Sequence, residues 1–340
     1  MRLPAHGVLG QWIRSAALVF ALALASRASA AQEPSGARGE EIVVNLAAGR
    51  VVIAVVKDAM VIGTVEDPIE SETRPPTPTV LGSTRVCIVL GADEWVSPGA
   101  HREVARLSTE LPRLRSRMVS SSPHLEQAQE GTEASDIESV GQALLERLNQ
   151  VASLLHGRVD LPLNEPITEL VIADYLPGYG PEAWQLTYEM KQEEEKDDYW
   201  STRVLRPVYL QFWPPEKGQP RTLIEFSYPP ENAPPSLLDL LRQNDNRLES
   251  IEKPDAKMAE VAGHFLAGES NKVMAVDAVQ FLRAALAAVS TPQARQTMIL
   301  IGRESGIQWI LAPPSEPVRP GTEETRPSDA PSLMKPPSSR

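Results

Sequence analysis

The sequence predicts an α+β fold, a four-layer αββα sandwich in which two largely antiparallel sheets stack on each other with helices outside. The expected strands come in blocks that alternate with pairs of helices, and not in single strand–helix–strand units, which favours antiparallel sheets. Several of these strands are apolar on both faces and therefore need cover on both sides. With 42% hydrophobic residues among 340, the chain can also form a sizeable core.

Residues 1–30 have the pattern of a secretory signal peptide. Arg2 and Arg14 are positively charged, residues 16–25 form an apolar run, and Ala28-Ser29-Ala30 gives the small-x-small cleavage pattern. This run is shorter than an ordinary membrane span, and no later apolar segment is long enough to cross a membrane. We therefore expect cleavage after Ala30 and an exported, periplasmic or extracellular protein without a membrane span; an uncleaved anchor is the alternative.

Residues 41–312 are predicted to form a single α+β domain with flexible segments. Residues 31–40 are expected to be a flexible mature N-terminus, and residues 119–135 a polar internal loop. The Pro-rich residues 313–340 have too few apolar side chains to offset the entropy of ordering, so a disordered tail is predicted.

The first strands of the domain are continuous apolar runs. Residues 51–56 and 60–65 are separated by Asp58-Ala59, which predicts a hairpin, and residues 85–90 predict a third strand. All three runs should be covered on both faces.

Two helices are expected next. The first has an apolar stripe that Pro112 should kink or interrupt. Its members are Val104, Leu107, Leu111, Leu114 and Met118. The second begins with a capping box at Ser135 and Glu138 and ends at Gly157. Its apolar face consists of Ile137, Val140, Leu144, Leu148, Val151 and Leu155.

The second half of the domain repeats this order. Strands are predicted at residues 168–173, 184–190, 204–213 and 222–228. The last two should form a pair across the turn at 214–218. Helices are predicted at residues 236–241, 257–267 and 273–289. The core stripe of the third helix is Val276, Val279, Leu282, Leu286 and Val289. A last strand at 307–311 should place Ile307, Trp309 and Leu311 on one side.

The order of these elements, from about Gly49 to Leu311, resembles the proteasome-like branch of the N-terminal-nucleophile hydrolases. Residues 49–65 are similar to that family's first strand, Lys-Asp turn and second strand. Residues 86–93 are similar to its next strand and glycine turn, and residues 170–175, followed by Gly180, to a later strand. The family has the four-layer sandwich, and its mature chains begin with a nucleophilic threonine.

The resemblance does not extend to the catalytic residues. The family's mechanism needs a hydroxyl or thiol beside a free α-amino group. Alignment on Lys57-Asp58 places Gly49 at the nucleophile position, or Arg50 after a one-residue slip, and neither side chain can attack a carbonyl. The family's acid falls on Val65, with Glu66 and Asp67 beside it.

Two further positions of the family's active site bear on this sequence. Lys57 is the only lysine among residues 1–190 and is already used in the turn, so the family's lysine on the next strand has no counterpart. Gly91 matches the glycine whose backbone N–H serves as an oxyanion donor. The resemblance thus implies a scaffold with no catalytic residue, in which Gly91 is a remnant of the oxyanion site.

Charge and cysteine content restrict the other functions. With 45 acidic and 33 basic residues, the net charge of −12 argues against a nucleic-acid partner. A single cysteine, Cys87, can form neither an internal disulfide nor a thiolate zinc cluster, and its apolar strand predicts a buried, inert thiol.

No metal or cofactor is predicted. The histidines after the signal are widely separated, at His101, His124, His156 and His264. The acidic run at 193–198 is typical of a solvated hairpin tip. Six aromatic residues could line a glycan- or peptide-binding face, although aromatic residues in strands more often pack in a core. They are Trp200, Tyr209, Phe212, Trp213, Phe226 and Tyr228.

We therefore predict an exported, non-catalytic binding or structural protein on a scaffold like that of the proteasome-like hydrolases. One alternative is a secreted amidase or peptidase of that family activated by processing. The other is a cell-surface glycan- or peptide-binding module. The partner is left open between another copy of the chain and a component of the cell envelope.

Overall fold

The computed structural model describes residues 43–66, 73–97, 102–121, 133–155, 166–176, 180–195, 199–214, 222–229, 234–252 and 255–313. These residues belong to one compact unit that begins at Glu40. The predicted signal peptide with its cleavage site after Ala30, residues 31–40, and nearly all of the tail at 313–340 lie outside the described residues. Those expectations stay predictions.

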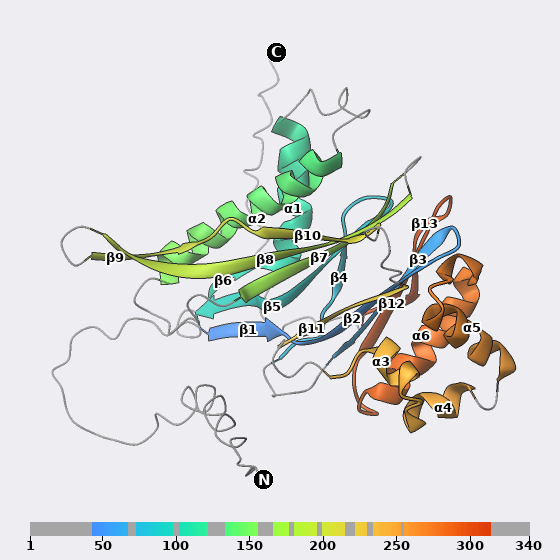
Figure 1. The fold of residues 1–340 in the computed structure, drawn as a ribbon. Coiled ribbons are helices and arrows are strands. Elements are labelled where there is room, and N and C mark those ends of the chain that lie inside the picture. Colours follow the sequence, from blue (N-terminus) through green and yellow to red (C-terminus); the bar gives the residue numbers. More distant parts are fainter. Residues whose placement is uncertain are drawn as a thin grey trace, which may run out of the picture. The chain divides into compact units, whose positions relative to one another are not determined.

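The predicted fold class is confirmed, because two largely antiparallel sheets are accompanied by helices (Figure 1). The eight-stranded sheet contains β1 (Val43–Ala47), β4 (Pro78–Val80), β5 (Arg85–Ser97), β6 (Arg102–Arg106), β7 (Pro166–Leu176), β8 (Gly180–Glu195), β9 (Tyr199–Val204) and β10 (Val208–Trp213). The five-stranded sheet contains, in spatial order, β11 (Leu223–Tyr228), β2 (Gly49–Val56), β3 (Ala59–Glu66), β12 (Gln296–Gly302) and β13 (Gly306–Leu311).

The helices form the two outer layers. They are α1 (Leu107–Ser121), α2 (Glu133–Leu155), α3 (Leu237–Arg242), α4 (Asn246–Glu252), α5 (Ala256–Leu266) and α6 (Ala275–Val289), with a short 3-10 helix at Ser270–Lys272. Figure 1 shows α1 and α2 on one side of the eight-stranded sheet and the other four helices beside the five-stranded sheet. Buried apolar clusters fill the three spaces between the four layers.

Residues 51–56 of β2 are apolar at every position because both faces of this part of the strand are covered. Val51 and Ile53 pack in the core between the two sheets, whereas Val52 and Ala54 pack in the core under the helices. Successive side chains point to opposite faces of a strand, so a strand with cover on both sides needs an apolar residue at each position.

The hairpin of β2 and β3 is confirmed, with a smaller turn than predicted. Ala59 already pairs with Val56 and is the first residue of β3. The turn is therefore Lys57 and Asp58. Asp58 has φ of 56°, a left-handed conformation that aspartate tolerates better than most residues.

Helix α1 begins later than the apolar stripe predicted. Val104 belongs to β6, which pairs with β5, and the helix begins at Leu107. Pro112 lies inside the helix and has no N–H to donate to the carbonyl of Ser108. That carbonyl instead accepts a hydrogen bond from the Thr79 hydroxyl at 3.3 Å, which gives it a partner that the proline cannot supply.

Helix α2 begins earlier than predicted. It starts at Glu133, so Ser135 is a helical residue and not an N-cap. The predicted loop at 119–135 is accordingly too long at both ends, and 122–132 lie outside the described residues. The predicted apolar face is buried at Ile137, Val140, Leu144, Leu148 and Val151.

The predicted pairing of residues 204–213 with 222–228 is wrong. The first segment contains the end of β9 and all of β10, and both strands pair with β8. β11 pairs with β2 in the other sheet. Both segments are apolar strands joined by a turn-rich stretch, and this pattern does not say which strand each one will pair with.

Two side-chain assignments near the C-terminal end also change. Val276 is 58% exposed, and the buried face of α6 is made of Ala278, Phe281, Leu282, Ala285 and Leu286. In β13, a bulge at Ile310 opposite Met298 and Ile299 reverses the alternation. Ile307 therefore packs between the sheets, whereas Leu311 packs on the helix side.

Candidate functional site

A pocket opens where β2 begins and β3 ends. Its volume is ≈ 220 Å³. It is lined by Gly49, Arg50, Val65, Glu66, Ser227, Tyr228, Pro229, Pro234, Val289, Ser290 and Thr291. The pocket therefore contains both positions that the family resemblance assigned to the nucleophile, and two of the three assigned to the acid. Asp67, the third, lies outside the described residues.

Gly49 is an internal residue of a buried stretch of chain. Ala47 and Ala48 before it are 2% and 1% exposed, and β1 pairs with β5 in the eight-stranded sheet. The chain passes from one sheet to the other at Ala48, and Gly49 then pairs with Tyr228 and Glu66 in the five-stranded sheet. Its φ of 148° is accessible to glycine and costly for other residues. The backbone path therefore accounts for a glycine at this position.

Arg74 holds this crossing in place. The Ala48 N–H donates to the Arg74 carbonyl at 3.0 Å, and the Arg74 N–H donates to the Leu46 carbonyl at 2.8 Å. The Arg74 guanidinium also forms an ion pair with the fully buried Glu94, which accepts a 2.9 Å hydrogen bond from Asn45. The backbone just before Gly49 is therefore hydrogen-bonded both to Arg74 and, through β1, to β5.

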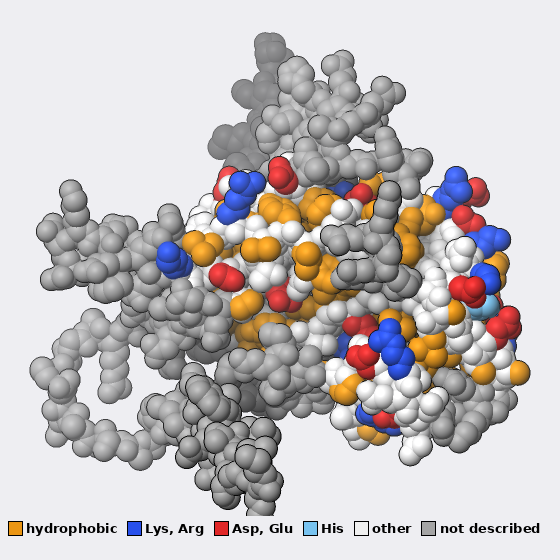
Figure 2. All heavy atoms as spheres, viewed as in Figure 1, with side chains coloured by type: hydrophobic (Ala, Val, Ile, Leu, Met, Phe, Trp, Pro, Cys, Tyr) orange, Lys and Arg blue, Asp and Glu red, His pale blue; other side chains and the backbone are white. Residues whose placement is uncertain are grey.

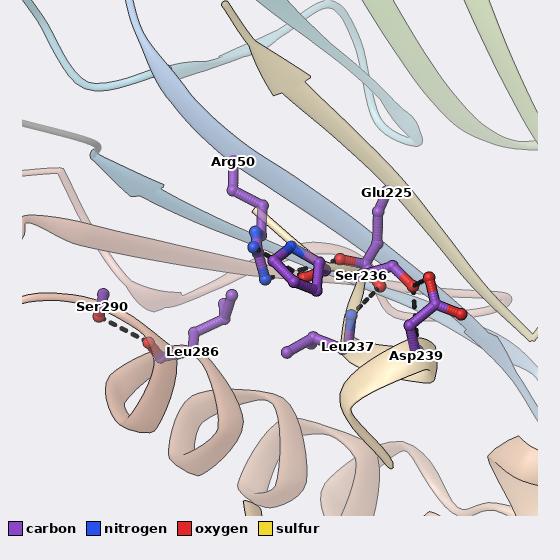
Figure 3. A network of polar contacts seen from close by, with 8 residues as sticks. Arg50, Glu225, Ser236, Leu237, Asp239, Leu286 and Ser290 are labelled. Carbon is purple, nitrogen blue, oxygen red and sulfur yellow. Dashed lines mark hydrogen bonds and ion pairs between the residues drawn. The ribbon is translucent and has the colours of Figure 1, made fainter. Parts of the chain in front are cut away.

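Arg50 forms the polar wall of the pocket (Figure 3). Its side chain is 6% exposed and its guanidinium donates to the Pro235 carbonyl at 3.1 Å. A second guanidinium nitrogen lies 3.8 Å from the Glu225 carboxylate, which accepts a 2.6 Å hydrogen bond from the Leu237 N–H. Burial raises the pKa of Glu225, and the Arg50 charge opposes that rise. Arg50 therefore links β2 to the segment before α3 through Pro235, and its charge partly offsets the burial of the Glu225 carboxylate.

Two polar side chains of the lining, Ser290 and Glu66, also form hydrogen bonds within the fold. Ser290 donates to the Leu286 carbonyl at 2.6 Å and accepts from the Gln296 amide at 3.4 Å. Glu66 accepts two hydrogen bonds from Arg295, at 2.7 and 2.8 Å. Among the described lining residues, neither a histidine nor a lysine accompanies these hydroxyls. The lining offers hydrogen-bonding groups for recognition in an otherwise apolar hollow.

Gly91 lies close to the same site. It is in β5 with φ of 79°, and a Cβ there would lie 2.6 Å from the Ile167 carbonyl oxygen and 3.0 Å from the Tyr228 ring. Tyr228 also pairs with Gly49 and lines the pocket. The structure therefore brings Gly91 to the ring of a residue whose backbone pairs with Gly49, while the oxyanion role of the Gly91 N–H stays a prediction.

Five of the six aromatic residues pack against the hydrophobic cores of the fold. Phe212 and Phe226 meet edge to face between the sheets, with ring centroids 4.9 Å apart. Trp213 and Tyr228 pack against the same core, and Tyr209 packs on the helix side of the eight-stranded sheet. The Trp200 side chain lies outside the described residues. The aromatic residues whose side chains are described do not form one exposed face.

The remaining candidates are elsewhere or undescribed. His264 contacts Glu260 and Glu269 on and after α5, outside the pocket lining, and His101, His124 and His156 are not described. The described residues contain no cluster of potential metal ligands. Sequence reasoning missed Ser227, Pro234, Ser290 and Thr291, because they come from segments distant in sequence and belong to no motif.

No family model matches the chain, and no curated protein matches it either. In the part of the chain that the structure describes, no helix is both long enough and apolar enough to cross a membrane.

Proposed function

We propose that this protein is an exported, non-catalytic binding protein on a scaffold like that of the proteasome-like hydrolases, and that the pocket at Gly49 binds a small polar molecule. The observation that carries the proposal is the position of Gly49. It lies at the expected nucleophile position, yet it is joined through the buried Ala47 and Ala48 to a strand of the other sheet. A free α-amino group at Gly49 would require cutting this crossing.

The pocket supports a binding role. The Arg50 guanidinium, the Glu66 carboxylate and the hydroxyls of Ser290 and Thr291 surround a hollow of ≈ 220 Å³ with apolar walls. Ligand sites in proteins commonly combine apolar walls with a few polar groups that orient the ligand. The export part of the proposal is supported by the signal-like pattern of residues 1–30.

The proposal is tested first by the N-terminus of the secreted protein and by amide hydrolysis. Expression with the full signal should give a mature chain that starts at Ala31 and shows no turnover of fluorogenic amide substrates. Edman degradation or intact mass reads the start. A chain that starts at a serine or threonine within the first strands, and that hydrolyses an amide, would refute the non-catalytic assignment and favour the processed amidase.

The second test concerns the pocket. We expect a panel of small carboxylates, amides and amines to contain compounds that raise Tm. Thr291→Trp should abolish these shifts, since Thr291 is exposed at the pocket wall and a large side chain there fills the hollow. Thr109→Trp, on an exposed position of α1, is the matched control and should retain them. Shifts of equal size in both variants would place the binding site elsewhere.

A further inference from the structure

The five-stranded sheet covers only part of the eight-stranded sheet. Ile88 on β5 and Val171 on β7 are 1% and 0% exposed on the inner face, beneath the other sheet. On the same face of β10, Val208 is 62% and Leu210 is 51% exposed. Phe212, the next residue on this face, packs against β11, so the cover ends beside that strand. Figure 2 shows hydrophobic side chains at the surface in the region of the eight-stranded sheet.

Two cross-strand rows make up this uncovered surface. Val208 lies opposite Thr187, which lies opposite Glu169, and Leu210 lies opposite Gln185. We call these five residues the inner strip. The surface combines two exposed aliphatic side chains at the edge strand with polar groups on the neighbouring strands.

Glu169 is the unusual member of the inner strip. It is 7% exposed and accepts a 2.9 Å hydrogen bond from Gln185. No ion pair joins it to a basic side chain among the described residues. Burial raises the pKa of Glu169. An incoming cation would compensate a buried carboxylate that has no charged partner among the described residues.

The strands beside the inner strip have free edges. Within the described residues, β10 pairs only with β8 and β11 pairs only with β2. An edge strand presents backbone N–H and C=O groups that can pair with an added strand. A strand added beside β11 would lie above the inner strip at the usual spacing of stacked sheets.

We propose that the inner strip binds an extended segment of a partner protein in which apolar residues alternate with lysine or arginine. The segment continues the five-stranded sheet beside β11, and its inward side chains repeat at the two-residue spacing of Val208 and Leu210. One basic side chain pairs with Glu169. A second copy of this chain is a poor occupant, because its net charge of −12 gives it an excess of acidic groups.

The test uses a random heptapeptide library displayed on phage, selected on the whole protein. We expect the selected peptides to alternate apolar and basic residues and, as synthetic fluorescent peptides, to lose affinity about tenfold or more with Leu210→Glu or Val208→Glu. Glu169→Gln should weaken basic peptides more than their lysine-to-glutamine analogues. Leu266→Glu, at an exposed leucine of α5, is the control and should bind normally.

The outcomes separate this surface from the pocket. Thr291→Trp should leave peptide binding unchanged, so failure of the pocket proposal does not affect this test. The proposal would be overturned by peptides that bind wild type, Val208→Glu and Leu210→Glu equally. It would also be overturned by a library that shows no enrichment. A wild-type dimer that Leu210→Glu dissociates would overturn it as well, because the occupant would then be a second copy.

Discussion

At the scale of single residues, Glu169 and Glu269 should affect the pH dependence of stability in opposite directions, because one is buried and the other lies beside basic side chains. Burial raises the pKa of Glu169, whereas Lys272 and His264 lower the pKa of the exposed Glu269. A raised folded-state pKa means that stability falls as pH rises from the unfolded-state pKa through the folded-state pKa. A lowered folded-state pKa has the opposite sign, and its stabilising contribution is lost as pH falls through the folded-state pKa.

The two glutamates should therefore respond oppositely to the same substitution. Near neutral pH, Glu169→Gln should raise the free energy of unfolding, since the amide can still accept the Gln185 hydrogen bond without a buried charge. Glu269→Gln should lower it slightly. Both differences should shrink below the ordinary glutamate pKa of about 4.3. Urea unfolding across this pH range checks the signs, and a pH-independent effect of Glu169→Gln would contradict the argument from burial.

At the scale of elements, the contact of α6 with β3 depends on the absence of a side chain at Gly63. A Cβ there would lie 2.4 Å from Cδ1 of Leu286, a fully buried residue of α6. Overpacking of this kind costs about 1–3 kcal/mol, because the neighbouring helix must shift or adopt poor rotamers. The glycine thus sets how closely the outer helix layer approaches the sheet.

Gly63→Ala should accordingly lower the free energy of unfolding by about 1–3 kcal/mol. Gly263→Ala is the control: this glycine lies in α5 with nothing within 4 Å of an added Cβ. Alanine there should stabilise the protein by about 0.5–1 kcal/mol through its higher helix propensity. Urea or thermal unfolding measures both. Equal effects of the two substitutions would show that the contact with Leu286 does not limit the packing.

At the scale of the whole molecule, the chain joins its two sheets at the place where the pocket lies. β1 belongs to the eight-stranded sheet and β2 to the five-stranded sheet, with Ala48 between them. A cut before Gly49 would separate β1 from β2 and break the crossing that Arg74 holds with two backbone hydrogen bonds. A mature chain that starts at Ala31, well before β1, keeps this crossing intact, so the expected N-terminus is the one that preserves the connection between the two sheets.

Local pattern was sufficient for many of the elements. The apolar runs of β2 and β3 and the helical face of α2 are repeated features of neighbouring residues, and their burial follows from the period of each element. The helix at α4 and the start of α1 were missed, because the first has little apolar periodicity and the second continues the apolar pattern of β6.

The sequence by itself determined the α+β class, the apolar strands with cover on both faces, and the lack of a nucleophilic side chain at Gly49. Only the tertiary structure decided that β10 and β11 belong to different sheets, that Ser290 and Thr291 join Arg50 in one pocket, and that Val208 and Leu210 stay uncovered. The spacing of apolar residues predicts on which face of its own helix or strand each residue lies. Which elements then meet depends on long-range packing, which no short stretch of sequence encodes.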